Sequence, residues 1–433
     1  MAEKNKINPS IVLGHDCRFG GELFVETAAS VFIANGIHVY QAKGFVSTPM
    51  ISLGTVHVKA GAGIIITASH NPPSYNGFKI KASFGGPATQ AMIDEVQLLI
   101  PEHYDGAEAN LNEARENDHL TEIDLETLYC NQIEKSFDLK LIKEKKLELA
   151  YDAMYGAGQN VIRRLFPEAT LLHCEHNPGF MGQAPEPIHK NLYEFSEMIR
   201  ISEEIDCGLV TDGDADRIGL YNKKGEFIDS HHIILLLIHY LHKYKNLDGK
   251  VITTFSATNK IRKLCEAYGL PIQITKIGFK YICEYMIKEK VLVGGEESGG
   301  IAITGHIPER DGIWIGLTIW EFMAKTGKSL DELIKEVYEV TGTFAMERND
   351  LYIQENQKLS IIEKCHTGHY KSFGSYRIVN METVDGFKFH LHTGDWVMIR
   401  PSGTEPVLRT YAEANDSKTA FDILEQTQNT ILL

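Results

Sequence analysis

The stretch Leu209-Val-Thr-Asp-Gly-Asp-Ala-Asp-Arg217 places a short apolar run directly before a loop of three carboxylates. Three other apolar runs also lead into polar or Gly-rich loops: Ile64-Ile-Ile66 before Thr67-Ala-Ser-His-Asn-Pro72, Val291-Leu-Val293 before Gly294–Gly300, and Trp396-Val-Met-Ile399 before Arg400–Thr404. Short apolar runs closed by turn residues are typical of buried strands. Stretches with helical periodicity lie between them, at 22–34, 120–146, 259–268 and 329–340. This alternation predicts an α/β fold with open sheets, in which ligands bind beyond the carboxyl ends of the strands.

Composition narrows the classes of partner. The chain has 433 residues, which predicts two to four domains at about 100–200 residues each. The apolar share of 43% is enough for ordinary cores. The net charge of −15 disfavours nucleic acid and anionic lipid as partners, but it allows an anionic small substrate wherever Arg and Lys cluster.

The cysteines and the apolar runs bear on location. The seven cysteines are scattered without a Cys-x-x-Cys pair, which predicts reduced, mostly buried thiols in a cytoplasmic protein. The apolar run Ile233–Leu241 is too short to span a bilayer and contains His239, so we expect a core helix there. We therefore predict no membrane association.

The loop Thr67–Pro72 presents a candidate nucleophile. Ser69 follows a predicted strand, and Asn76-Gly77 predicts a tight turn that brings Lys79 back toward it. A serine hydroxyl needs a base or a metal beside it to react, and His70 and Lys79 are the nearby candidates. Taken alone, the loop is better explained as a structural surface turn.

The loop Asp212–Arg217 predicts a metal site. Carboxylates at Asp212, Asp214 and Asp216 can converge on one hard cation. An EF-hand would need Gly at its sixth position and Glu at its twelfth, where this chain has Arg217 and Lys223. Three carboxylates beside an arginine instead fit a magnesium ion that also meets a phosphate.

Two further loops predict sugar and phosphate contacts. If the segment is extended, Glu296 and Ser298 point the same way and suit the vicinal hydroxyls of a sugar, although an ordinary Gly-rich turn explains the sequence nearly as well. The loop at 400–409 combines hydroxyls, backbone amides and guanidinium groups, which is the composition of a phosphate cradle. It lacks the Lys-Ser/Thr ending of a Walker loop, so ATP is not implied. Its candidate residues are Arg400, Ser402, Gly403, Thr404 and Arg409.

Together and in this order, the four motifs resemble those of the α-D-phosphohexomutase family, which includes phosphoglucomutases, phosphomannomutases and phosphoglucosamine mutases. The resemblance covers nearly the whole chain. It implies three α/β domains of similar topology and a smaller α+β C-terminal domain around a central cleft. Softer composition changes near 101–120, 243–250 and 342–356 are consistent with such divisions. The expected domains are 1–115, carrying the phosphoserine, 116–230, binding the metal, 231–342, recognising the sugar, and 343–433, binding phosphate.

The resemblance also implies roles for single residues. Ser69 would carry the phosphoryl group and supply one metal ligand, while Asp212, Asp214 and Asp216 would hold Mg²⁺. Arg217 would lie near the phosphate, with His70 and Lys79 as proton-transfer or charge-neutralising groups. The expected substrate contacts are Arg18, Lys280, Glu296, Ser298, Arg400, Ser402, Gly403, Thr404 and Arg409. Lesser matches are Asp16 beside Arg18, Thr48-Pro49, Gly278-Phe279-Lys280 and Arg310-Asp311-Gly312.

The implied activity is interconversion of hexose 1-phosphate and hexose 6-phosphate through phosphoserine and a hexose 1,6-bisphosphate. The expected partner is a sugar phosphate, and the expected assembly is a monomer or homodimer. Family members of the glucosamine type carry Glu-Gln-Ser-Gly-His where this chain has Glu296-Glu-Ser-Gly-Gly300, which favours glucose or mannose.

One departure keeps other functions open. Relatives usually begin with a Phe-Gly-Thr-Ser-Gly-x-Arg-Gly segment and a helix, whereas this chain reaches Ile11–Asp16 almost at once. We therefore expect a first sheet that lacks one strand and a site that lacks one arginine. The alternatives are a catalytically impaired sugar-phosphate binder and a metal-dependent sugar phosphatase.

Overall fold

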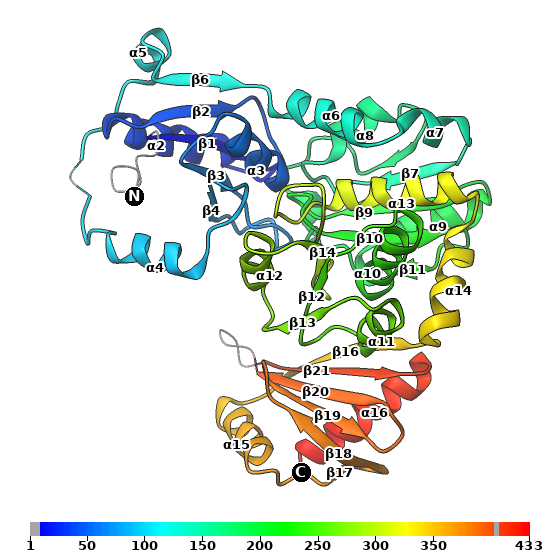
Figure 1. Cartoon of the computed structure of the whole chain (residues 1–433). Helices are drawn as coiled ribbons and strands as arrows, with labels where there is room; N and C mark the ends of the chain where they lie inside the picture. The colour runs from blue at the N-terminus through cyan, green and yellow to red at the C-terminus, as the bar shows by residue number, and fades with distance from the viewer. Residues whose placement is uncertain (1–8, 105, 402–406) are drawn as a thin grey trace. The chain divides into compact units, whose positions relative to one another are not determined.

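The computed structural model describes residues 9–104, 106–401 and 407–433, and its strands form four sheets (Figure 1). The chain divides into two compact units. The first comprises Met1–Ile252 and Gly278–Lys335, and the second comprises Thr253–Ile277 and Glu336–Leu433. All seven cysteines are buried free thiols, as the sequence predicts.

The first sheet has the order β5-β4-β3-β1-β2-β6. Strand β1 pairs in parallel with β2 and β3, and β4 returns antiparallel along β3. The edge strand β6 pairs with β2, so this sheet extends past the predicted domain boundary at 115. Its elements are β1 Ser10–His15, α2 Gly21–Ala34, β2 His38–Ala42, α3 Thr48–His57, β3 Ala62–Ile66, β4 Phe78–Ala82, β5 Gly86–Pro87, α4 Gln90–Leu98, α5 Leu111–Glu116 and β6 Leu120–Ile123.

The second sheet has the order β11-β10-β9-β7-β8, with β7 parallel to its neighbours β8 and β9, and β10 antiparallel to β9. Strand β9 is buried along its whole length and ends where the loop of carboxylates begins. The elements are α6 Leu125–Ser136, α7 Leu139–Glu144, β7 Leu149–Asp152, α8 Gln159–Leu165, β8 Thr170–Leu172, short helices at Phe180–Gly182 and His189–Asn191, α9 Tyr193–Ser202, β9 Cys207–Thr211, β10 Ile218–Asn222 and β11 Phe227–Ile228.

The third sheet has the order β13-β12-β14-β15, with β14 and β15 forming an antiparallel hairpin around the Gly-rich loop. Its elements are α10 Ser230–His239 with a π-helical turn at Tyr240–Tyr244, β12 Lys250–Thr254, α11 Asn259–Tyr268, β13 Ile272–Thr275, α12 Phe279–Met286, β14 Val291–Gly295, β15 Ile301–Ile303, α13 Gly312–Thr326 and α14 Leu330–Thr341.

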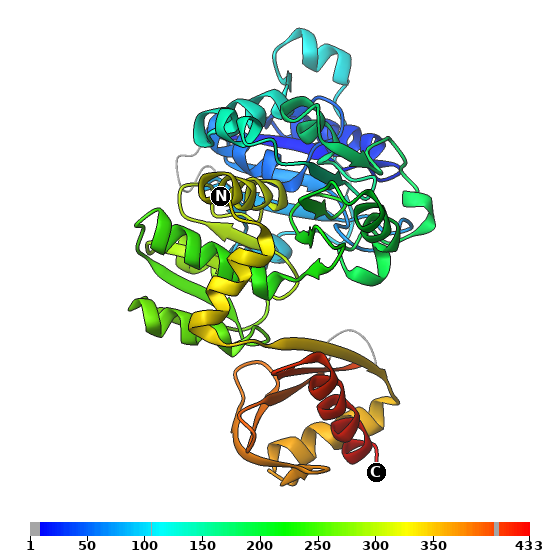
Figure 2. The same cartoon turned by 90° about the vertical axis from the view of Figure 1, so that its right-hand side faces the viewer.

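The fourth sheet is antiparallel, with the order β16-β21-β20-β19-β18-β17. Helices α15 and α16 pack on it around one apolar core that includes Ile361, Phe389, Leu408 and Ile423 (Figure 2). Its elements are β16 Ala345–Tyr352, α15 Glu355–His366, β17 Ser372–Phe373, β18 Tyr376–Glu382, β19 Phe387–Leu391, β20 Trp396–Pro401, β21 Val407–Ala414 and α16 Ser417–Ile431.

The four predicted strands are confirmed as β3, β9, β14 and β20, and the helices predicted at 22–34, 259–268 and 329–340 as α2, α11 and α14. The helical stretch predicted at 120–146 is wrong as a single element, because it contains β6, α6 and α7. Asp124 and Asp138 explain the division, since each side chain accepts a backbone N–H bond and caps the start of a new helix.

The apolar run at Ile233–Leu241 lies in buried helix α10 and the turn that follows it, as predicted. Within the described residues, no helix has both the length and the apolar character needed to cross a membrane.

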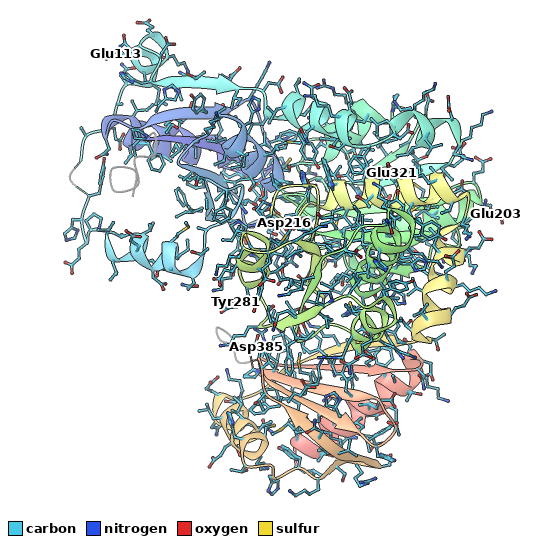
Figure 3. All side chains as sticks on the ribbon, in the orientation of Figure 1. Glu113, Glu203, Asp216, Tyr281, Glu321 and Asp385 are labelled. Carbon is cyan, nitrogen blue, oxygen red and sulfur yellow. The ribbon has the colours of Figure 1, made fainter. Side chains whose placement is uncertain are left out.

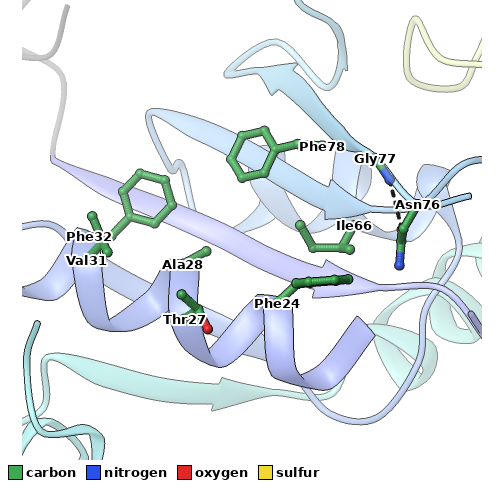
Figure 4. A pocket seen from close by; sticks show the side chains of 9 residues that line it. All are labelled: Phe24, Thr27, Ala28, Val31, Phe32, Ile66, Asn76, Gly77 and Phe78. Carbon is green, nitrogen blue, oxygen red and sulfur yellow. Dashed lines mark hydrogen bonds between the residues drawn. The ribbon is translucent and has the colours of Figure 1, made fainter. Parts of the chain in front are cut away.

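An apolar groove of about 560 Å³ opens beside α2 in the first sheet (Figure 4). Phe24 and Phe32 from α2 line it together with Ile66 and Phe78 from β3 and β4. Its lining includes none of the predicted site residues, so we do not assign the reaction to it.

Helix α13 approaches strand β9 closely at a glycine. A Cβ atom on Gly316 would lie 2.5 Å from a Cδ atom of Leu209, which is fully buried. Gly316→Ala is therefore expected to destabilise the protein by about 1–3 kcal/mol through overpacking. Thermal and urea unfolding would measure this loss, and an unchanged midpoint would show that the helix can shift to admit the methyl group.

Candidate active site

Ser69 lies in a tightly held turn after β3. Its backbone is in the left-handed region with φ 53°, and its N–H donates to Thr67 Oγ1 at 2.9 Å. Its hydroxyl donates to Asp212 Oδ2 at 2.7 Å. Ser69 and Asp212 are 143 residues apart, so this contact joins the predicted nucleophile loop to the predicted metal loop.

Arg18 holds the Ser69 turn through hydrogen bonds to its backbone. Its guanidinium donates to four backbone oxygens, those of Ser69 at 2.7 Å, Asn71 at 2.6 Å, Pro72 at 2.8 Å and Tyr75 at 3.0 Å. Arg18 is almost fully buried and also pairs with Asp16 at 3.3 Å. This placement differs from the predicted substrate contact, because the donors of Arg18 are used to shape the turn.

The three carboxylates of the metal loop converge. Asp212, Asp214 and Asp216 are fully buried, and one oxygen from each lies within 4.8 Å of the others. Ala215 adopts φ 55°, and the backbone N–H groups of Asp216 and Arg217 donate to Asp212 Oδ1 at 2.9 and 3.0 Å. The loop therefore wraps around the Asp212 side chain.

Two cations face the triad. Lys79 Nζ lies 2.7 Å from Asp214 Oδ2 and 3.6 Å from Asp216 Oδ2. Arg310 donates to Asp216 Oδ2 and lies 3.6 Å from Glu296 Oε2. Strand β4 presents Lys79 because the hairpin after Asn76-Gly77 places it opposite Ile65, which fits the predicted return of Lys79 toward the serine.

Burial and these charges shift several pKa values. Burial, reinforced by the two neighbouring carboxylates, raises the pKa of Asp212 well above its ordinary value. Burial also opposes the charge on Asp214, but Lys79, Thr48 and Arg310 together outweigh burial, and the pKa of Asp214 lies well below its usual range. Burial lowers the pKa of His70 to about 3, with the charge of Arg217 acting in the same direction.

The triad fits a hard divalent cation. Among the described residues, the buried oxygens Asp214 Oδ1 and Asp216 Oδ1 have no hydrogen-bond partner. A buried acceptor without a partner is costly unless something else satisfies it. All the donor atoms are carboxylate oxygens, the ligand type that Mg²⁺ prefers, and Ser69 Oγ lies beside them.

The loop Glu296–Gly300, which is predicted to contact the sugar and is called the sugar loop below, lies against the metal loop Asp212–Arg217. It is not extended. Glu296–Gly299 form a tight turn closed by bonds from Glu296 N to Gly300 O at 3.0 Å and from Gly299 N to Glu296 O at 3.2 Å. The extended segment, on which the shared direction of Glu296 and Ser298 was conditional, is therefore not what the structure shows. Burial, against the opposing charge of Arg310, raises the pKa of Glu296 to about 7.

Backbone contacts fix the sugar loop and the metal loop to each other. Gly300 forms a β-bridge with Arg217, and Ile218 N donates to Gly299 O at 3.1 Å. Arg217 thus lies between the two loops, with its guanidinium 3.9 Å from Glu186.

Lys280, another predicted substrate contact, donates from its ammonium group to Gln90 Oε1 at 2.5 Å.

The predicted phosphate residues belong to the second unit. Arg400 and Arg409 are register partners on β20 and β21, so their side chains leave the same face of that sheet. Arg400 pairs with Asp385 at 3.5 Å. Ser402, Gly403 and Thr404 lie outside the described residues.

Two residues of this site were lesser matches in the sequence, with no role at the metal assigned to them. Thr48 Oγ1 donates to Asp214 Oδ2 at 2.5 Å, and Arg310 bridges Asp216 and Glu296. Their short motifs, Thr48-Pro49 and Arg310-Asp311-Gly312, were the available signal. Nothing in those motifs indicates that they contact the metal loop.

The chain matches known protein families along nearly its whole length. Four domain families match in order: phosphoglucomutase/phosphomannomutase α/β/α domains I, II and III at residues 1–105, 127–225 and 229–341, and the C-terminal domain at 346–429. A phosphoglucosamine mutase of Methanocaldococcus jannaschii is 30% identical, with 98% of this chain and 92% of that protein aligned. A phosphoglucomutase/phosphomannomutase of Thermococcus kodakarensis is 27% identical over 98% of this chain and 90% of that protein.

A solved structure agrees with these matches. A protein of Thermus thermophilus, provisionally named a phosphomannomutase, has a TM-score of 0.85 and 31% identity over 98% of this chain and 90% of its own. The chain therefore belongs to the phosphoglucomutase/phosphomannomutase family and is a phosphohexomutase, an intramolecular phosphotransferase.

Proposed function

We propose that this protein interconverts hexose 1-phosphate and hexose 6-phosphate, with glucose or mannose as the hexose, through phosphorylated Ser69 and a hexose 1,6-bisphosphate. The observation that carries the proposal is the contact of Ser69 Oγ with Asp212 at 2.7 Å, inside a buried carboxylate triad. A phosphoryl group on that oxygen would lie beside both the metal ligands and the cations that neutralise phosphate. The buried free thiols support a cytoplasmic location.

In the proposed reaction, the bond between Ser69 Oγ and phosphorus breaks as the free sugar hydroxyl forms a new bond to the same phosphorus. The hydroxyl proton leaves to a nearby base, for which the neutral imidazole of His70 is the candidate, while Lys79, a cation paired with Asp214, neutralises charge on the transferring group. The bisphosphate then returns its other phosphoryl group to Ser69. Positioning and charge stabilisation account for most of the catalysis in phosphoryl transfer.

The chain's own residues would supply that stabilisation. Asp212, Asp214 and Asp216 would hold Mg²⁺, which supplies positive charge to the transferring group. Lys79 brings a second positive charge within 2.7 Å of the triad. We propose that Glu296 and Ser298 contact the sugar hydroxyls, and that Arg400, Ser402, Gly403, Thr404 and Arg409 bind the phosphate that does not react.

The sugar preference rests on the loop Glu296-Glu-Ser-Gly-Gly300. Relatives named as phosphoglucosamine mutases and as phosphoglucomutase/phosphomannomutase match at similar identity, so overall similarity does not separate these substrates. Glucose and mannose differ only at C2, which we do not expect Glu296 and Ser298 to read. We therefore propose that both sugars are accepted.

The test is a direct assay. Glucose 1-phosphate, mannose 1-phosphate and glucosamine 1-phosphate would each be supplied with Mg²⁺ and a trace of glucose 1,6-bisphosphate, and hexose 6-phosphate and free phosphate would be measured. We expect conversion of the first two sugars without phosphate release. Phosphate release alone would identify a phosphatase, and substrate binding without turnover would identify an impaired binder. Faster conversion of glucosamine 1-phosphate would overturn the proposed preference.

A further inference from the structure

A fully buried ion pair joins strand β4 to the loop before α13. Lys81 Nζ lies 2.7 Å from Glu309 Oε2, and their side chains are 2% and 0% exposed. Ser52 Oγ donates to the same carboxylate oxygen at 2.9 Å. Desolvation offsets much of the attraction in a pair buried this deeply, so stability is a weak explanation for it. This ion pair is therefore better explained by a role other than stabilising the fold.

The loop that Glu309 fixes carries Arg310. The other carboxylate oxygen of Glu309 accepts the backbone N–H of Arg310 at 3.1 Å. The Arg310 side chain then crosses the ring of Phe279, 5.5 Å from its centroid, and reaches Asp216 and Glu296. Glu309 thus sets the point from which Arg310 reaches the metal loop and the sugar loop.

Strand β4 fixes two loops at once. Lys79 and Lys81 are two residues apart and so leave the same face of the strand. Lys79 contacts Asp214 in the metal loop, and Lys81 contacts Glu309 beside Arg310. The two lysines therefore attach the metal loop and the loop that carries Arg310 to the same strand, which follows the Ser69 turn.

Gly300 leaves the space through which Arg310 passes. A Cβ atom at this position would lie 2.4 Å from Arg310 Cδ and 3.2 Å from Glu296 Oε2. Glu309 thus holds the backbone at Arg310, and the missing side chain of Gly300 admits its methylene groups.

We propose that Lys81 and Glu309 are positioning residues for phosphoryl transfer: they place Arg310, which in turn holds Asp216 and Glu296 at a fixed separation. The inference rests on the proposed active site. It predicts that the buried pair affects turnover through Arg310 and has little effect on turnover once Arg310 is removed.

A double-mutant cycle tests this dependence. The variant Lys81→Met/Glu309→Gln removes both charges and so leaves no unpaired buried charge. We expect kcat to fall about 10- to 100-fold, as misplacement of a catalytic group does, with a smaller change in KM. In an Arg310→Ala background, the same pair of substitutions should change kcat by less than about twofold, because the residue they position is absent.

Glu321 provides a matched control. Its buried carboxylate accepts a hydrogen bond from the Tyr240 hydroxyl at 2.6 Å and pairs with Lys245 at 2.9 Å and Lys325 at 3.2 Å, so, like Glu309, it has hydroxyl and ammonium partners, but away from the site (Figure 3). Glu321→Gln is expected to lower the melting temperature without changing kcat. If it lowers kcat as much as the pair variant does, the effect of the pair is general destabilisation and the inference fails.

Gly300→Ala perturbs Arg310 from the opposite side. The methyl group would displace a flexible side chain, so we expect a loss of kcat with little change in melting temperature, and no further loss when Arg310→Ala is also present. Equal losses in both backgrounds, for this variant and for the buried pair, would overturn the inference. An Arg310→Ala enzyme as active as the wild type would also overturn the inference, because turnover would then not depend on the residue that the pair positions; the proposed function is tested separately, by the sugar-phosphate assay of the unmodified protein.

Discussion

Ser69→Ala is expected to reduce mutase turnover by about 10⁵-fold or more, the scale seen when a catalytic nucleophile is removed. The hydroxyl is the only group in the proposed mechanism that carries the phosphoryl group between the two ends of the sugar. Its oxygen lies 2.7 Å from Asp212, and alanine places no oxygen there to accept a phosphoryl group.

The Ser69→Ala protein should nevertheless fold. Arg18 holds the turn through four backbone oxygens, and those bonds do not require the Ser69 side chain. Serine already occupies the left-handed region at this position, so alanine adds little backbone strain. We expect a melting temperature within a few degrees of the wild type.

The measurement is turnover together with phosphoryl labelling. Incubation with labelled glucose 1,6-bisphosphate should mark the wild type and fail to mark Ser69→Ala. Ser196→Ala is the matched control, because that buried hydroxyl, on helix α9, donates at 2.7 Å to Gly225 O in the turn between β10 and β11. A labelled Ser69→Ala protein that retains turnover would place the phosphoryl carrier elsewhere.

Local sequence was sufficient for the strands that end in the site. The runs before Ser69, Asp212 and Glu296 are short, apolar and closed by turn residues, and each is a buried strand. The triad was also predictable, since alternate carboxylates after a buried strand have few other uses. Its convergence within 4.8 Å agrees with that interpretation.

What escaped prediction depends on contacts between distant residues. The sequence does not indicate that Lys81 meets Glu309, 228 residues away, or that Thr48 meets Asp214, 166 residues away. A shared direction of Glu296 and Ser298 was expected only for an extended segment, and Gly299, with φ 90°, allows a turn there instead. Arg18 was assigned to the substrate from the resemblance of Asp16 and Arg18 to a family motif, and the sequence does not reveal its backbone acceptors, which lie more than 50 residues further along the chain.

The second large effect is expected from Asp214→Asn, which should raise the Mg²⁺ concentration needed for activity by about 100-fold or more. Losing even a group behind a metal ligand costs about 10- to 100-fold in affinity, and Asp214 is a proposed ligand. Its ionised state is favoured by Lys79, which holds the pKa of this carboxyl well below its usual range. Asparagine keeps the shape and can still accept the hydroxyl of Thr48, but it removes the charge that attracts the cation.

The Asp214→Asn protein should lose some stability, because the fold favours the ionised form of Asp214, but it should remain folded, since Lys79 keeps Asp216 at 3.6 Å and the asparagine can still accept from Thr48. Metal binding can therefore be measured from the melting temperature, without relying on turnover. Millimolar Mg²⁺ or Mn²⁺ should raise the melting temperature of the wild type, since a ligand that binds only the folded state stabilises it, and should raise that of Asp214→Asn much less. Asp138→Asn, which removes one negative charge from the exposed cap of α7, should respond to the metal as the wild type does. Equal metal stabilisation of Asp214→Asn and the wild type would show that the triad is not the cation site, and Lys79 and Arg310 would then be its permanent counterions.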